Sequence, residues 1–80
     1  MRIVQEIPNS SCKITVFHWN NRYIVKLENN FLEQTFKIDQ FEVGHEKDLQ
    51  KIIDDQFIKQ AIDRFSTMAA SLQEALQRVE

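Results

Sequence analysis

The 80-residue chain is long enough for one small domain, and its 42% hydrophobic and 28% charged residues are typical of a globular protein rather than a disordered one. A formal charge of −2 disfavours general binding to nucleic acid or to anionic membranes, because such binding relies on a basic excess. No stretch approaches the ~20 apolar residues that cross a bilayer, and the single Cys12 forms no internal disulfide, so we expect a cytoplasmic protein.

The first expected strand covers residues 2–7. Pro8 and the three polar residues after it predict a turn, because Pro cannot donate to a strand ladder and Asn and Ser close turns through their side chains. A tight turn here sets Ile3 opposite Val16 on the core side of the sheet. Gln5 would then also point towards the core, which places it at an open edge or indicates a bulge.

Two pairs of asparagines predict the next two hairpins. Asn tolerates positive φ better than any residue but Gly, so Asn20-Asn21 and Asn29-Asn30 each suit a two-residue turn. With both turns this short, Lys26 pairs with Glu33 across the second hairpin. The strands then form an antiparallel meander in the order 1-2-3-4 over residues 2–38.

This pairing sorts the side chains onto two faces of different chemistry, because side chains alternate along a strand. A slip of one residue in either turn would mix the two sets. The predicted core face is nearly all apolar and consists of Cys12, Ile14, Val16, His18, Tyr23, Val25, Leu27, Leu32, Gln34, Phe36 and Ile38.

Helices are expected at about 46–53 and 56–78, after a crossing loop in which Phe41 and Val43 can cap the core and Gly44 supplies a positive φ. The apolar residues before and after Asp54-Asp55 would point in nearly opposite directions on one straight helix, which predicts a break there with Asp as a helix cap. The expected fold is therefore a single α+β domain over residues 1–80, with both helices packed on one sheet face.

The long helix has more apolar surface than the sheet can cover. At 1.5 Å per residue it spans about 34 Å, whereas an eight-residue strand spans about 27 Å. Its apolar stripe nevertheless continues to the end through Leu72, Ala75, Leu76 and Val79. Uncovered apolar surface commonly marks association. These residues predict a homodimer; the alternative is a tip that frays or folds over the sheet edge.

The open sheet face provides a second candidate interface. Its candidate partner-binding residues are Phe17, Trp19, Arg22, Ile24, Lys26 and Lys37. Aromatic and basic residues on an exposed sheet can bind a protein or stack single-stranded bases. Between these two functions, the acidic net charge favours a protein partner. The structural alternative is cross-strand packing that only stabilises the sheet.

We find no pattern that predicts catalysis, a cofactor, a metal or a small-molecule ligand. Cys12 and His18 lie six residues apart on one strand, roughly 20 Å, which is too far for a nucleophile and its base. Two His and one Cys without close ligand spacing do not predict a metal site. The expected protein is not an enzyme, and the remote alternative is a site near His45.

The four strands followed by helix resemble the layout of single-stranded-DNA-binding transcriptional coactivators, which act as dimers; the resemblance covers about residues 11–65. The basic loops of that family are missing here. The segments Lys13–Asn20 and Glu33–Lys37 are also similar to small bacterial proteins of unknown function. The second resemblance implies no activity and no functional residue.

Overall fold

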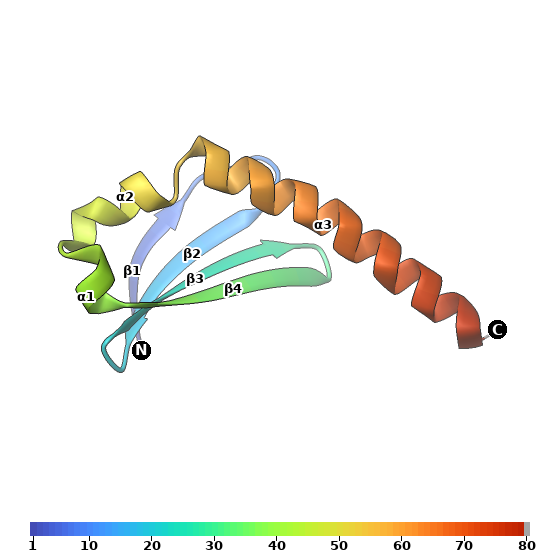
Figure 1. Cartoon of the computed structure of the whole chain (residues 1–80), viewed down its shortest axis with the longest axis horizontal. Coiled ribbons are helices and arrows are strands. Elements are labelled where there is room, and N and C mark those ends of the chain that lie inside the picture. The colour runs from blue at the N-terminus through green and yellow to red at the C-terminus, as the bar shows by residue number, and fades with distance from the viewer. Residues whose placement is uncertain (80) are drawn as a thin grey trace.

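The computed structural model describes residues 1–79 and shows an α+β fold (Figure 1). Four antiparallel strands form one open sheet in the order β1-β2-β3-β4, which confirms the predicted meander. The strands are β1 (Arg2–Ile7), β2 (Lys13–Trp19), β3 (Arg22–Asn29) and β4 (Leu32–Asp39). The helices are α1 (Gln40–Val43), α2 (Leu49–Ile52) and α3 (Asp55–Leu76), with 3-10 turns η1 (Glu46–Asp48) and η2 (Gln77–Val79).

The first hairpin has the predicted turn and register. Asn20 and Asn21 both have positive φ, 56° and 62°, as a primed two-residue turn requires. Val16 pairs with Val25, and Trp19 pairs with the arginine directly after the turn. The paired asparagines therefore set which side chains of β2 and β3 face the helices.

The turn of the second hairpin lies one residue later than the predicted turn at Asn29-Asn30, which was wrong, and the pairing register is shifted by two residues. Its central residues are Asn30 and Phe31, and of these only Asn30 has a positive φ, 51°. Asn29 belongs to β3 and pairs with Leu32. A shift of two residues preserves the alternation of side chains, so both faces keep the predicted residues.

A β-bulge at Val4 divides β1 into two registers. Gln5 pairs with Val16, whereas Ile3 pairs with Phe17. The predicted pairing of Ile3 with Val16 was therefore wrong, and the bulge that Gln5 indicated is confirmed. A bulge adds one residue to one strand and reverses its alternation, which places Ile3 on the open face.

The chain leaves β4 through α1 rather than through the predicted crossing loop. Asp39 caps this short helix, since its Oδ1 accepts a hydrogen bond from the Phe41 N–H at 3.0 Å. Val43 is buried as predicted, but Phe41 is 83% exposed and does not cap the core. Two residues apart on a helix, these side chains point to different sides. Gly44 follows with the predicted positive φ, 81°.

The predicted break between the later helices is confirmed at Asp54. The expected helix at 46–53 is divided into η1 and α2, and α3 begins at Asp55. Asp54 Oδ1 accepts a hydrogen bond from the Phe57 N–H at 2.9 Å, as a helix N-cap does. The expected long helix at 56–78 corresponds to α3 continued by η2.

The hydrophobic core lies between the predicted core face of the sheet and the helices. Val16, Val25 and Leu27 have no exposed surface. The helical segment from α2 onwards adds the buried residues Leu49, Ile53, Ile58, Ala61 and Phe65. The opposite face of the sheet carries no helix within residues 1–79 (Figure 1).

Polar bonds fix α3 on β4. The Gln34 amide donates to the Ala61 carbonyl at 2.8 Å and accepts from Arg64 Nε at 2.9 Å. The Arg64 guanidinium also lies 5.7 Å from the centre of the Phe36 ring, within cation–π range. Gln34 is thus satisfied on an otherwise apolar face, and it helps to set the direction in which α3 leaves the sheet.

The second half of α3 projects beyond the sheet. Figure 1 shows the helix crossing over the strands and continuing past the β3–β4 turn to the C-terminal end of the chain. The radius of gyration is 14.5 Å, against about 12 Å for a compact domain of this length. The overhang predicted from the helix length is therefore present.

Candidate interaction surfaces

The projecting part of α3 carries a helix-tip stripe, defined as Leu72, Ala75, Leu76 and Val79. The last buried residue of the helix is Phe65, which is 3% exposed. Beyond it the exposed fractions rise to 38% at Leu72, 53% at Leu76 and 81% at Val79. The structure thus places the predicted self-association residues together on α3 and η2, with Leu72, Leu76 and Val79 exposed and Ala75 half-buried.

A groove lies where α3 passes the end of the sheet. Its volume is about 710 Å³, and Leu32, Met68, Leu72 and Ala75 line its apolar part. Met68 is half-buried and joins the core to the stripe. Apolar surface therefore runs without interruption from the core to the helix tip, a continuity that requires the folded hairpin as well as the helix.

The open sheet face carries a second apolar group, the open-face cluster of Ile3, Phe17, Trp19 and Ile24. Ile3, Phe17 and Ile24 lie side by side on β1, β2 and β3, because each pairs directly with the next. Ile3 is 57% exposed and Trp19 is 53% exposed, whereas the other two are half-buried. Ile3 was not predicted to belong to this cluster. The bulge exposes Ile3, and the only sign of the bulge in the sequence was that Gln5 would face the core.

The basic residues predicted around this cluster differ in whether a carboxylate binds them. Lys26 Nζ lies 3.4 Å from Glu28 and 3.3 Å from Glu33, although the predicted direct pairing of Lys26 with Glu33 was wrong. The hydrogen bond with Glu33 and the charge of Glu28 raise the Lys26 pKa. Arg22 stands opposite Asp39 in the strand register. Within residues 1–79, Lys26 is thus the one of the three basic residues held by ion pairs with neighbouring carboxylates.

Lys37 stands beside Ile24 on the edge strand and is exposed, so it lies next to the open-face cluster. Thr15, one row further along β2, is 4% exposed even though it belongs to the open face. Its neighbours in the sheet are Glu6 and Lys26, whose long side chains can cover it. The open face is therefore apolar at one end and charged at the other.

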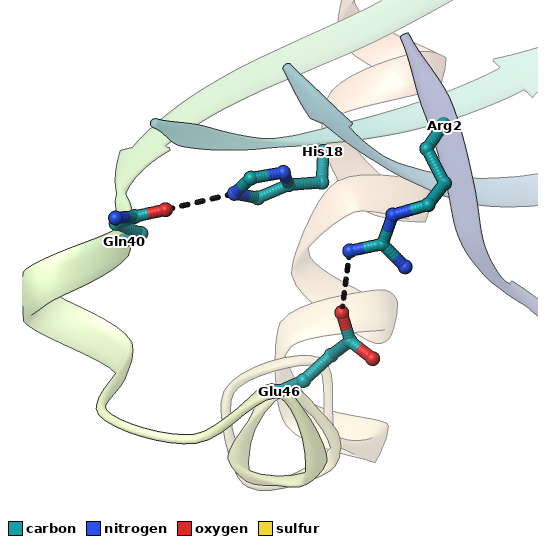
Figure 2. Close-up of polar contacts among 4 residues, drawn as sticks. All are labelled: Arg2, His18, Gln40 and Glu46. Atoms are coloured by element: carbon teal, nitrogen blue, oxygen red, sulfur yellow. Dashed lines mark hydrogen bonds and ion pairs between the residues drawn. The ribbon is translucent and has the colours of Figure 1, made fainter. Parts of the chain in front are cut away.

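The polar contacts nearest the imidazole of His18 are structural. His18 Nε2 donates to Gln40 Oε1 at 2.8 Å (Figure 2). The centres of the His18 and Tyr23 rings lie 5.1 Å apart. Arg2 and Glu46 form a separate ion pair at 3.1 Å. These contacts connect β1 and β2 to the chain that follows β4, and none of them reaches Cys12.

The His and Cys side chains of the described residues do not gather into one site. Within residues 1–79, no three His, Cys, Asp or Glu side chains lie close enough together to hold a metal ion. His45 is exposed in the loop before η1. Over the same residues, no helix has the length and apolar content that a membrane span requires.

Cys12 is a buried thiol at the start of β2, 8% exposed, and burial raises its pKa. A raised pKa lowers the fraction of reactive thiolate near pH 8, and burial restricts access. We expect a disulfide reagent at pH 8 to modify the folded protein at least about tenfold more slowly than the urea-unfolded chain. Equal rates, followed by absorbance of the released thiolate, would show that this thiol is accessible and reactive.

Comparison of the chain with protein-family models, with curated proteins and with solved structures gives no match. Inferences about function therefore rest on the two apolar surfaces.

Proposed function

We propose that the chain is a non-catalytic protein-interaction module that associates with a second copy of itself through the helix-tip stripe. The observation that carries this proposal is the continuous exposure of Leu72, Leu76 and Val79 on a helix that leaves its own sheet. Burying what remains exposed of these side chains would contribute roughly 1–2 kcal/mol each, which favours association and is offset in part by the freedom that two copies lose on binding.

The rest of the helix supports a role in binding rather than in folding. Its core contacts end near Phe65, so the projecting turns add little to the stability of the isolated domain. A helical segment of about three turns has only marginal stability in water unless its apolar face is packed against another surface. A second copy supplies such a surface without any further component.

Sedimentation equilibrium tests the association directly. We expect the mass to rise from that of one 9.5 kDa chain at low micromolar concentration towards that of two chains at high micromolar concentration. A mass equal to one chain throughout this range would overturn the proposal.

The open-face cluster favours a second interaction, with a different protein. Trp and Phe are enriched in protein interfaces, and Ile3 adds exposed apolar surface to the cluster that the sequence indicated. Single-stranded nucleic acid is the alternative ligand. It is less well supported because Lys26 is held by two glutamates and the net charge is −2.

Trp19 fluorescence distinguishes these ligands. We expect mixed single-stranded oligonucleotides at low salt to leave the emission unchanged, because stacking on Trp19 needs basic groups to hold the backbone. Quenching that fades as salt is added would instead identify nucleic acid as the ligand. The double substitution Phe17→Ser and Trp19→Ser is the control for the fold: its far-UV circular dichroism should match that of the parent protein.

A further inference from the structure

We infer that the second copy docks on the helix-tip stripe with its own α3 antiparallel, and that each helix tip reaches the β3–β4 hairpin of the other copy. This inference rests on the self-association proposed above and adds the orientation, the register and a second contact. Four features of the structure carry it: the spacing of the stripe, the side of the helix that the stripe occupies, the residues that flank it and an exposed phenylalanine.

The spacing of the stripe identifies the occupant as a helix. Apolar residues recur along α3 and η2 at alternating intervals of four and three, at Ala61, Phe65, Met68, Leu72, Ala75 and Val79. This is the heptad spacing of a left-handed pair of helices. The first two residues of the series are buried against the sheet, Met68 and Ala75 are half-buried, and Leu72 and Val79 continue the same seam as exposed side chains.

The direction of the seam determines the orientation. The seam points towards the sheet at Ala61 and Phe65, so a second helix on the projecting part must approach from the side that the sheet occupies. In a parallel pair, the sheets of both copies would lie at the same end and both between the two helices, where they would collide. In an antiparallel pair, the sheets lie at opposite ends, and each helix tip fills the space beside the other sheet.

The length of the overhang sets the register. Overlap of the projecting segments 68–79 places Leu72 against Ala75 of the second copy, and Met68 against Val79 of the second copy. On each side of the seam runs a row of flanking residues. In an antiparallel pair each such row lies beside the same row of the second copy, so Leu76 lies beside Ala69 of the second copy. On the other flank Arg78 meets a serine, and no like charges face one another.

The hairpin supplies the second contact. Phe31, at the β3–β4 turn, is 73% exposed, and it lines a hollow with Phe65 and Ala69 of α3. In the antiparallel register, Val79 of the second copy reaches the level of Met68, close to where this hairpin ends. An overlap of three turns is only roughly 18 Å long, which is short for an interface that must bury about 600 Å² or more of accessible surface per partner. The hairpin contact enlarges the interface and covers Phe31.

Cysteine cross-linking with a short bis-maleimide tests the orientation, with Cys12→Ala as the background. The variants are Met68→Cys, Val79→Cys and the two combined. In the proposed register, positions 68 and 79 of different copies are adjacent. Like positions lie about 16 Å apart along the axis, as do 68 and 79 within one helix. We therefore expect a covalent dimer from the combined variant and from a mixture of the two single variants. Either single variant alone should give no covalent dimer. Ala70→Cys, on the outer side of the helix, is the matched control without a cross-link.

Two other results would overturn the inference in distinguishable ways. A covalent dimer from Val79→Cys alone, with a dimeric mass in sedimentation, indicates a parallel pair; association then stands and the orientation falls. A monomeric mass for the uncross-linked protein at high micromolar concentration removes the association as well. Phe31→Ser separates the hairpin contact: an unchanged dimer affinity would show that the tip does not reach it.

Discussion

The Leu72→Glu variant is expected to remain a folded monomer at concentrations where the parent protein is a dimer. Leu72 is the first residue of the helix-tip stripe, and in the proposed pair it is buried against Ala75 of the second copy. Two carboxylates per dimer would then lose water without gaining a partner, at a combined cost of about 3 kcal/mol or more. This corresponds to at least about a 100-fold rise in the dissociation constant. Sedimentation equilibrium over a concentration series measures it.

Ala70→Glu is the matched control, because it adds the same charge to the same helix on its outer side. It should leave the dissociation constant within about threefold of the parent value. Thermal unfolding at low micromolar concentration should be similar for both variants, since Leu72 is already 38% exposed in a single chain. An equal loss of association in both variants would attribute the effect to net charge rather than to the stripe.

The Leu27→Ala variant is expected to lose much of the stability of the fold. Leu27 lies in the middle strand pair, has no exposed surface and is surrounded by core side chains. Replacing a buried leucine by alanine costs about 3–5 kcal/mol, because a cavity remains. The total stability of an 80-residue domain is of the order of 4–12 kcal/mol. With a urea dependence of about 1 kcal/mol per molar, the midpoint of urea unfolding should fall by about 3 M.

Leu76→Ala, measured at a concentration low enough for a monomer, is the control for this loss. It removes the same atoms from a side chain that is 53% exposed in the single chain. Its free energy of unfolding should change by less than about 0.5 kcal/mol. If both leucine variants lost the same stability, the helix tip would contribute to the folded core, and the structural basis for self-association would be lost.

The alternation of apolar residues was the strongest information in the sequence. It predicted the strand order and the buried side chains of β2 and β3 because the first turn needs two residues with positive φ, which Asn20-Asn21 supply. The same rule placed the second turn one residue too early and the register of its strands two residues off. There a single positive φ at Asn30 is enough, and the neighbours on either side do not select between the two registers.

The candidate surfaces were less predictable than the core. Leu72, Leu76 and Val79 were found because a helix longer than its sheet must overhang it, which is a matter of length alone. Ile3 was expected on the core side of the sheet, and Phe31 was not among the predicted partner-binding or self-association residues. A bulge turned the first outward, and a shifted turn left the second at the end of the hairpin.

The sequence by itself determined the strand order, the core face and the position of the helix break at Asp54, because these depend on local periodicity, turn residues and capping. Only the tertiary structure decided the bulge in β1, the register of the second hairpin and the direction in which α3 leaves the sheet. These depend on contacts between residues far apart in the chain, such as Gln34 with Ala61 and Arg64, which no local pattern encodes.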